Sequence, residues 1–306
     1  MPVAIFDMDG VLYRGSVVLP NAPETLDRLR RGGWDVFFAT NNSTASRAEY
    51  VARLTALGLG GDEAHVVTSA YATAHYLVRL EPRPADVFVV GANGLRDEIR
   101  AVGIGVRDAD ALPGAHPPAA AAADGVAPAA MRDYLSGLQL PPPADTVVVG
   151  LDLHLTYAKL AEAQRALLAG ARFVASNRDR AYPVEGRLLP GAGSIVAALE
   201  VASGRTAVCI GKPEPWLFEE VLRRAAAAPD ALGEGRSDGA GPVVVVGDAP
   251  EYDIVAAHRI GALGVLITTG LTDASAVAAA SGDARPDHVI HALDEVLELP
   301  EVRPHL

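Results

Sequence analysis

The stretch Val3-Ala-Ile-Phe-Asp-Met-Asp-Gly10 decides the fold, because a short apolar run ends in two carboxylates one residue apart and a glycine. The run Val3–Phe6 has the length of a buried strand. Successive strand residues point to opposite faces, so Asp7 and Asp9 project together only where the strand ends and Gly10 lets the chain turn. Two acids at the carboxyl end of a strand favour a hard-cation site, and open α/β sheets place their chemistry at that end. By itself, the stretch also fits a strand followed by an ordinary Asp-Gly turn.

The composition limits the classes of protein to which the chain can belong. Its 306 residues allow one large or two moderate domains, and half of them are apolar. A net charge of -12 argues against nucleic acid and anionic membranes as partners, but it leaves room for a small phosphorylated substrate. No apolar run reaches the roughly 18 residues of a membrane span, and the first strand starts at Val3, so we expect a cytoplasmic protein without a signal peptide. The single cysteine, Cys209, forms no internal disulfide.

Short apolar runs alternate with amphipathic stretches along the chain. The predicted strands are Val3–Phe6, Val36–Ala39, Val87–Val90, Val147–Val149, Phe173–Ala175, Ala207–Ile210, Val243–Val246 and Val265–Ile267. The predicted helices are Ala22–Arg31, Ser46–Leu57, Ala70–Leu80, Tyr157–Ala169, Gly193–Ser203, Trp216–Ala227 and Ile254–Ile260. This alternation predicts parallel sheets covered on both faces. Two insertions interrupt it: Pro113–Pro143, with a short helix expected around Ala129–Leu138, and a solvated loop over Pro229–Pro242.

A second strand ends in hydroxyls and amides within Phe-Phe-Ala-Thr-Asn-Asn-Ser-Thr, residues 37–44. The predicted anion-binding groups are the Thr40 hydroxyl and the backbone N–H groups of Asn41 and Asn42. Capping of the next helix by Ser43 or Thr44 explains the same residues without a ligand, and the two interpretations are compatible.

Lysine is rare in this chain: of its 26 lysine and arginine residues, only Lys159 and Lys212 are lysines. Lys212 lies in Cys-Ile-Gly-Lys-Pro-Glu-Pro, residues 209–215, just beyond an apolar strand. Arginine and lysine are not interchangeable where a compact point charge is needed, so Lys212 is a candidate for phosphate binding. The alternative is a solvated lysine.

A further apolar strand, Val243–Val246, is followed by Gly247 and Asp248, and Asp253 comes five residues later at a helix start. Asp248 is placed to complete a cation site with the first acid pair. Asp253 either orients that site or caps the helix. All four motifs follow strands, so we expect one parallel sheet to bring them to one edge.

In this order, the motifs Asp-x-Asp-Gly, Thr-Asn, Gly-Lys-Pro and Gly-Asp-x4-Asp resemble the haloacid dehalogenase-like hydrolases, and the resemblance covers the whole chain. The long gap between Thr40 and Lys212 resembles the NagD-like branch with a type-IIB cap, as do residues 147–152, 157–160, 175–179 and 189–193 within it. The resemblance implies an α/β fold: a doubly wound, Rossmann-like parallel-sheet core of residues 1–72 and 193–306, and an inserted α/β cap of residues 73–192.

The resemblance implies a Mg²⁺-dependent phosphatase that hydrolyses a small phosphomonoester through an aspartyl-phosphate intermediate. Asp7 would be the nucleophile, Asp9 the general acid and base, and Lys212 a ligand of the phosphate together with Thr40, Asn41 and Asn42. The metal ligands would be Asp7, Asp248 and the Asp9 carbonyl, with Asp253 positioning Lys212 or a metal-bound water. Asp9 favours phosphate chemistry over dehalogenation, since a halide leaving group needs no proton.

In the cap, Asn177 and Asp179 are the candidate substrate-binding residues. The substrates left open are glycerol phosphate, phosphoglycolate, pyridoxal phosphate, nucleoside monophosphates and, as a surrogate, p-nitrophenyl phosphate. Because enzymes with a large cap often self-associate through it, we also expect a homodimer. The expected partner is thus a small phosphorylated metabolite, with no nucleic acid and no membrane.

Several rival classes fail on the residues themselves. A P-loop needs Gly-x4-Gly-Lys-Ser/Thr, whereas Pro213 follows Lys212. A dinucleotide site needs Gly-x-Gly-x-x-Gly after the first strand, and this pattern does not follow Val3–Phe6. The Gly-x-Ser-x-Gly elbow of serine hydrolases does not occur either. A phosphotransferase or phosphomutase on the same fold stays open, because it shares the aspartyl-phosphate. A non-catalytic phosphate-binding protein also stays open.

Overall fold

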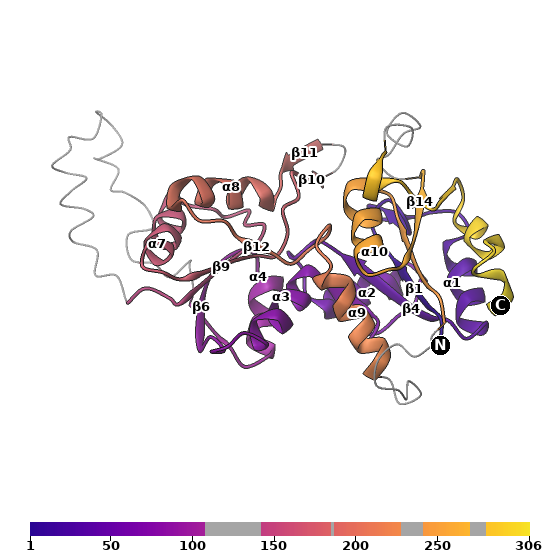
Figure 1. Ribbon diagram of the computed structural model, residues 1–306, viewed down its shortest axis with the longest axis horizontal. Coiled ribbons are helices and arrows are strands. Elements are labelled where there is room, and N and C mark those ends of the chain that lie inside the picture. The colour runs from indigo at the N-terminus through magenta and orange to yellow at the C-terminus, as the bar shows by residue number, and fades with distance from the viewer. Residues whose placement is uncertain (108–141, 185–186, 228–240, 270–279) are drawn as a thin grey trace. The chain divides into compact units, whose positions relative to one another are not determined.

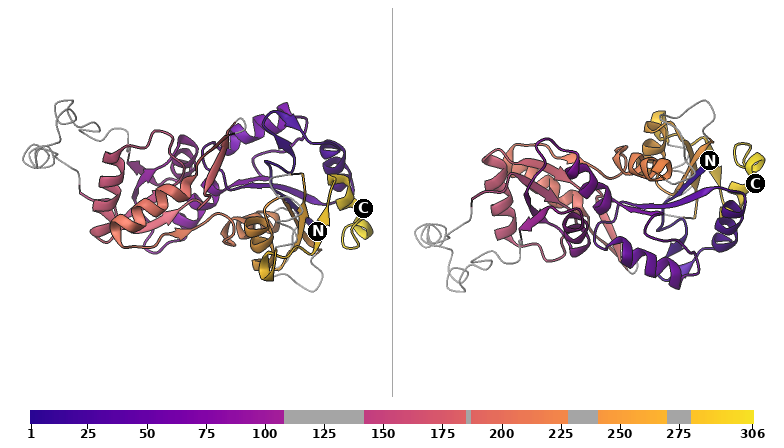
Figure 2. Two further views of the ribbon diagram at one scale, coloured as in Figure 1. Left: turned by 90° about the horizontal axis from the view of Figure 1, so that it is seen from above. Right: turned by 90° about the horizontal axis from the view of Figure 1, so that it is seen from below.

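The structure, a computed structural model, describes residues 1–107, 142–184, 187–227, 241–269 and 280–306. The described chain divides into two compact units, Met1–Ala72 with Ile210–Leu306, and Thr73–Cys209 (Figure 1). Both chain termini belong to the first unit (Figure 2), where the His305 ring contacts Trp34 edge-on with centroids 6.1 Å apart. No helix of the described residues is long and apolar enough to cross a membrane.

The first unit is built on a parallel sheet of six described strands in the order β15-β14-β13-β1-β4-β5. These strands are β1 (Val3–Phe6), β4 (Asp35–Thr40), β5 (Val66–Thr68), β13 (Val243–Gly247), β14 (Leu263–Ile267) and β15 (His288–Ile290). Every residue of β1 and β13 is buried, as expected of strands covered on both faces. β1 pairs with β4 on one side and β13 on the other, so the strand order reverses at β1 and the crevice of the fold lies beyond its carboxyl end.

The helices of the first unit cover this sheet. They are α1 (Ala22–Arg31), α2 (Arg47–Ala56), α9 (Trp216–Ala227), α10 (Val255–Arg259), the π-helical turn η2 (Pro250–Ile254) and the 3-10 turns η3 (Gly282–Ala284), η4 (Leu293–Glu298) and η5 (Arg303–His305). The start of α2 is fixed by a capping box, in which the Ser46 N–H donates to Glu49 at 2.7 Å and the Glu49 N–H donates back to Ser46. An apolar core that includes Phe6, Phe38 and Val246 joins the helices to the sheet.

The second unit has its own parallel sheet of five described strands in the order β12-β9-β8-β6-β7. Its elements are α3 (Ser69–Val78, which begins in the first unit), β6 (Asp86–Val90), α4 (Asn93–Ala101), β7 (Gly105–Arg107), β8 (Thr146–Val149), α7 (Tyr157–Leu168), β9 (Arg172–Ala175), the hairpin β10 (Ala181–Val184) and β11 (Arg187–Pro190), α8 (Ala192–Ser203) and β12 (Val208–Cys209). Because α7 and α8 share one apolar core with β8 and β9, the unit has a hydrophobic interior of its own.

The predicted fold class, a doubly wound parallel α/β sheet with a second α/β unit inserted, is confirmed, and each predicted strand is present. The sequence-based boundary at residue 193 differs from the structure, which divides the units between Cys209 and Ile210. The reason is packing: α8 buries Ile195 and Leu199 in the core of the second unit, and β12 pairs with β9. The helix predicted around Ala129–Leu138 and nearly all of the predicted loop Pro229–Pro242 lie outside the described residues.

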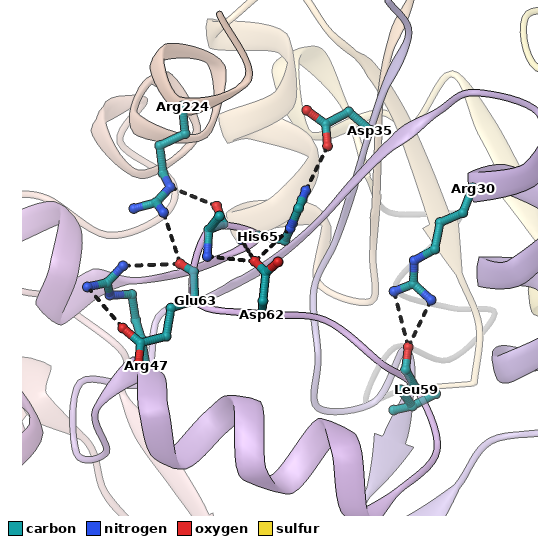
Figure 3. A network of polar contacts seen from close by, with 9 residues as sticks. Arg30, Asp35, Arg47, Leu59, Asp62, Glu63, His65 and Arg224 are labelled. Atoms are coloured by element: carbon teal, nitrogen blue, oxygen red, sulfur yellow. Dashed lines mark hydrogen bonds and ion pairs between the residues drawn. The ribbon is translucent and has the colours of Figure 1, made fainter. Parts of the chain in front are cut away.

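The loop that leads from α2 into β5 is held by arginines of the surrounding helices (Figure 3). These contacts join Arg30 to the Leu59 carbonyl, Arg47 to the Glu63 carbonyl, and Arg224 to the carbonyls of Glu63 and Ala64. At the end of the loop, His65 lies between two carboxylates, 3.1 Å from Asp35 and 2.8 Å from Asp62. The hydrogen bond with Asp35 is the main cause that raises the pKa of His65 above its usual 6.5, with Asp62 adding to it and burial opposing it.

His65→Gln tests this contact through the pH dependence of stability. Since the folded-state pKa is raised, protonated His65 stabilises the fold in full below about pH 6.5, and this contribution is lost as the pH rises through the folded pKa. We expect the difference in free energy of unfolding between wild type and variant to be about 0.5 kcal/mol larger at pH 5.5 than at pH 9, because the side chain is partly exposed. Urea unfolding at both pH values measures it, and a difference that does not change with pH contradicts the assignment.

Candidate active site

Three carboxylates gather beyond the carboxyl ends of two neighbouring strands. Asp7 directly follows β1, Asp248 directly follows β13, and Asp253 lies in the turn η2. One oxygen of each carboxylate lies within 4.8 Å of the other two. The sheet produces this arrangement because β1 and β13 pair in parallel and end at the same edge.

The ammonium of Lys212 lies against this acidic cluster. Its Nζ donates to Asp7 Oδ1 at 2.7 Å and to Asp253 Oδ1 at 2.5 Å, and the lysine side chain is only 4% exposed. Burial by itself lowers the pKa of Lys212, but the charges of Asp253 and Asp7 outweigh it and hold the pKa above its ordinary value. The two carboxylates that Lys212 contacts therefore favour its positively charged form. The alternative of a solvated lysine is excluded.

Lys212 reaches this cluster by a route that the sequence did not predict. We expected its preceding strand to belong to the same sheet as the other motifs, but β12 pairs with β9 in the second unit. The expectation was wrong because an apolar run predicts a strand without specifying its partner. Lys212 instead lies on the segment by which the chain returns to the first unit at Ile210.

The returning segment is fixed by the side chain of Asn41. Asn41 Oδ1 accepts from the Lys212 N–H at 2.7 Å, and Asn41 Nδ2 donates to the Lys212 carbonyl at 3.0 Å. The hydroxyl of Ser69 in turn donates to the Asn41 carbonyl. On the far side of the turn, Arg259 donates to the Pro213 carbonyl at 3.0 Å. The Asn41 side chain thus positions the lysine backbone, a role that its place beside Thr40 did not indicate.

Asp253 is held from two directions. Its Oδ1 accepts from Lys212, and its Oδ2 accepts from the Ala249 N–H at 3.1 Å. A methyl group on Gly247 would lie 2.2 Å from the Asp253 Cβ, so only glycine permits this approach. Because both carboxylate oxygens of Asp253 have protein partners, its geometry fits a residue that orients Lys212.

The charges of the cluster fit a divalent cation. Burial is the main cause that raises the pKa of Asp7 well above its usual range; Lys212 opposes the shift, and Asp253 and Asp248 add to it by like-charge repulsion. One ammonium among three carboxylates leaves two negative charges. Carboxylate oxygens are the ligands that Mg²⁺ prefers, and a bound cation would favour the ionised form of Asp7.

Asp9 is exposed, and its carboxylate is not one of the three clustered groups. This agrees with an assignment in which only its backbone carbonyl is a metal ligand. Although the residue as a whole is exposed, desolvation of its carboxyl by neighbouring groups raises the pKa of Asp9 above its ordinary value, and the nearby Arg53 guanidinium opposes that shift. The carboxyl thus keeps its proton to a higher pH than a free aspartic acid, as a general acid requires.

The turn that was predicted to bind an anion contains internal hydrogen bonds. The Asn42 N–H donates to Thr40 Oγ1 at 3.2 Å, and the Asn42 side chain accepts from the N–H and hydroxyl of Thr44. The cap of α2 is Ser46, so the expectation of Ser43 or Thr44 as the cap was wrong. The helix begins later because Ser46 is followed three residues on by Glu49, which completes the capping box.

The candidate substrate residues Asn177 and Asp179 lie in the second unit, in the loop after β9. Asn177 is buried, and its Oδ1 accepts from the Asp179 N–H at 3.2 Å. The arginine between them is ion-paired with Glu200 at the end of α8. A methyl group on Gly193 would lie 2.5 Å from the Arg178 carbonyl, so the loop packs directly on the start of α8.

Sequence reasoning missed a second buried ion pair, which involves the other lysine. Lys159 is 1% exposed, and its Nζ donates to Asp152 at 2.8 Å and to the His154 carbonyl at 2.9 Å. The rarity of lysine, which drew attention to Lys212, applied equally to Lys159. It also missed Arg53 on α2, whose charge acts on Asp9.

Comparisons with known proteins identify the family of the chain. The haloacid dehalogenase-like hydrolase family matches residues 4–105, and a second HAD-hydrolase-like family matches residues 209–296. Human chronophin is 36% identical over 305 residues, which cover 96% of this chain and 91% of chronophin. The chain belongs to the haloacid dehalogenase-like hydrolases.

Solved structures of this family share the whole fold. The p-nitrophenyl phosphatase from Archaeoglobus fulgidus superposes with a TM-score of 0.75 at 29% identity and covers 97% of this chain and 98% of its own. A glycerol phosphate phosphatase from Mycobacterium tuberculosis, solved in complex with magnesium, has a TM-score of 0.74 at 30% identity. The match covers 95% of this chain and 74% of the mycobacterial one. These relatives lie in the NagD-like branch, as the sequence motifs indicated.

Asp248→Asn tests the cation site by binding. At a Mg²⁺ concentration 100 times its Kd, we expect wild-type protein to gain about 2.7 kcal/mol and its thermal midpoint to rise by about 5 °C. The variant loses one anionic ligand and should show neither the shift nor heat of binding by isothermal titration calorimetry. Asp27→Asn, which affects only a surface pair with Arg31, is the matched control. Wild-type affinity in Asp248→Asn would contradict the site.

Proposed function

We propose that this chain is a Mg²⁺-dependent phosphatase that hydrolyses a small phosphomonoester through a phosphorylated Asp7. The observation that carries the proposal is the buried contact of Lys212 with Asp7 and Asp253, beside Asp248. A nucleophile, a cation for the phosphoryl oxygens and oxygen ligands for a metal are thereby present within one cluster.

In the first step, an Asp7 carboxylate oxygen attacks phosphorus and the bond from phosphorus to the ester oxygen breaks. Asp9 donates its proton to the departing oxygen, which leaves as an alcohol. The raised pKa of Asp9 favours the protonated form that can donate this proton. Lys212 holds phosphoryl oxygens as charge spreads over them, which is the principal contribution a protein makes to phosphoryl transfer.

In the second step, Asp9, now ionised, takes a proton from water, and the water oxygen attacks phosphorus. The bond from phosphorus to Asp7 breaks, which restores the carboxylate and releases inorganic phosphate. General acid and base assistance by one residue contributes roughly 10²–10⁴ in rate. Lys212 stays charged throughout, so its contribution does not depend on a proton transfer.

Asp7, Asp248 and the Asp9 carbonyl would hold Mg²⁺. When bound, the ion screens the repulsion between an anionic nucleophile and an anionic phosphate. Thr40 and the amides of Asn41 and Asn42 complete the phosphate site. The Asn42 N–H would exchange its bond with Thr40 Oγ1 for one with the phosphate.

The second unit is proposed to act as the cap that selects the substrate, with Asn177 and Asp179 as the residues that contact it. Among substrates, glycerol phosphate is supported by the name of the mycobacterial relative and p-nitrophenyl phosphate by that of the archaeal one. A homodimer and a cytoplasmic location stay predictions from the sequence. The rival function is transfer of the phosphoryl group from Asp7 to an acceptor other than water.

Phosphate release from small phosphomonoesters tests the proposal. We expect Mg²⁺-dependent release, abolished by EDTA, from one or more of glycerol phosphate, phosphoglycolate, pyridoxal phosphate, a nucleoside monophosphate and p-nitrophenyl phosphate. Asp7→Asn should lower kcat by more than about a thousandfold, as loss of a nucleophile does in other enzymes.

Circular dichroism should show that Asp7→Asn is folded, and Asp27→Asn serves as the control for loss of a surface acid. If Asp7→Asn kept a tenth of the wild-type activity, the assignment of Asp7 as the nucleophile would be wrong. If no ester is hydrolysed but phosphate is transferred to an added sugar or alcohol, the phosphotransferase function is correct instead.

Gly193→Ala tests the proposed substrate loop. The added methyl would lie 2.5 Å from the Arg178 carbonyl, so the loop carrying Asn177 and Asp179 must shift. We expect KM for the best substrate to rise about tenfold with kcat changed less than threefold, since the first-unit cluster is untouched. Val201→Ala, at an exposed position of the same helix, is the control. An unchanged KM for a folded Gly193→Ala would remove this loop from substrate binding.

A further inference from the structure

The segment that carries Asp9 folds back on itself through Tyr13. The Gly10 N–H donates to the Tyr13 carbonyl at 2.8 Å, and Asp9 and Tyr13 form a β-bridge. Gly10 has φ 85°, a left-handed conformation that favours glycine and allows the tight return. The backbone position of Tyr13 therefore fixes the backbone of Asp9.

Arg53, on α2, holds this returning segment from outside. Its guanidinium carbon lies 4.4 Å from the centroid of the Tyr13 ring, and its Nη2 donates to the Gly15 carbonyl at 2.7 Å. Gly15 lies at the turn between β2 (Tyr13–Arg14) and β3 (Val17–Val18), which pair in antiparallel register. One side chain thus contacts both the strand that bridges to Asp9 and the turn that follows it.

The other end of the segment has a separate anchor. Thr269 Oγ1, from the chain after β14, donates to the Gly10 carbonyl at 2.9 Å. Asp9 directly precedes Gly10, which this second anchor holds, and the Tyr13 ring is completely buried although Arg53 itself is exposed. Loss of Arg53 would release the hairpin side of the segment while Thr269 still holds the other side.

We propose that Arg53 is a positioning residue for Asp9: by stacking on Tyr13 and binding the Gly15 carbonyl, it fixes the backbone from which the Asp9 carboxyl and carbonyl project. The proposal rests on the proposed function, in which Asp9 is the acid and base and its carbonyl a metal ligand. Arg53 is not among the residues that would hold phosphate or Mg²⁺; besides its hairpin contacts, its charge opposes the rise in the pKa of Asp9 described above. No motif marks this residue, because the contact spans 40 residues of sequence.

Arginine suits the role for a physical reason. A planar guanidinium stacks on an aromatic face and still directs N–H groups sideways to a carbonyl. Lysine keeps the positive charge and the ability to donate a hydrogen bond, whereas methionine keeps only the length of the side chain. We therefore expect Arg53→Lys to retain most of the function and Arg53→Met to lose it.

Steady-state kinetics on the panel described above tests the proposal. We expect Arg53→Met to lower kcat about tenfold, in the range seen for residues that orient a catalytic group, with KM changed less than twofold. Arg53→Lys should recover kcat to within about threefold of wild type. Arg31→Met, whose partner is a surface carboxylate on the same unit, is the matched control and should match wild type.

A double-mutant cycle separates positioning of Asp9 from a general structural effect. If Arg53 acts through Asp9, Arg53→Met lowers the residual p-nitrophenyl phosphatase activity of Asp9→Asn by less than twofold. A further tenfold loss in that background, as expected of independent effects, overturns the proposal. So does an Arg53→Met variant with wild-type kcat.

Hydrogen exchange decides the proposal even if the wild-type protein releases no phosphate and the proposed function fails. In Arg53→Met, the amides of residues 10–18 should exchange about tenfold faster than in wild type, while those of β1 and β13 stay unchanged. Unchanged exchange in 10–18 overturns the proposal whatever the activity. Faster exchange throughout the first unit also overturns it, because Arg53 would then be a general stabilising residue.

Discussion

The buried ammonium of Lys212 is the interaction on which the rest of the first unit depends. It is surrounded by Asp7 and Asp253, with Asp248 nearby, so that one positive charge is shared among three acids. Removing one partner of a buried ion pair costs about 3–5 kcal/mol, because the remaining charge is left without compensation. The two negative charges that Lys212 does not neutralise make the cluster a site for a divalent cation and a charged substrate. Stability and chemistry therefore depend on the same contact.

The surrounding fold serves to place these charges. β1 and β13 bring two acids to one edge of the sheet, and the absence of a side chain at Gly247 lets Asp253 approach the strand. Lys212 lies on the segment by which the chain returns from the second unit. The Asn41 side chain holds that segment by accepting from the Lys212 N–H and donating to the Lys212 carbonyl. The side-chain amide of Asn41, which directly follows β4, thus determines where the ammonium of the cluster lies.

The two lysines of the chain share one physical role. Lys159 in the second unit and Lys212 in the first are both buried, and each donates to aspartate at 2.8 Å or less. Arg47 and Arg224 stack on an aromatic ring instead, with guanidinium carbons 4.0 and 4.8 Å from the Tyr71 ring centroid. A compact ammonium fits a small buried site that a guanidinium fork would overfill. The rarity of lysine therefore indicated a buried, ion-paired ammonium at both positions, although the sequence analysis used it only for Lys212.

The sequence by itself determined the strand runs, the fold class and the acids at the strand ends, because buried parallel strands require continuous apolar runs and parallel strands end at a common edge. Three-residue strands such as β5 and β7 escaped prediction, since they carry almost no periodic signal. The helix α4 was also not predicted. Only the tertiary structure decided that β12 belongs to the second unit, that Asn41 clamps Lys212 and that Arg53 covers Tyr13. Each of these depends on contacts between residues that are distant along the chain, and local pattern contains no information about which distant residues will meet.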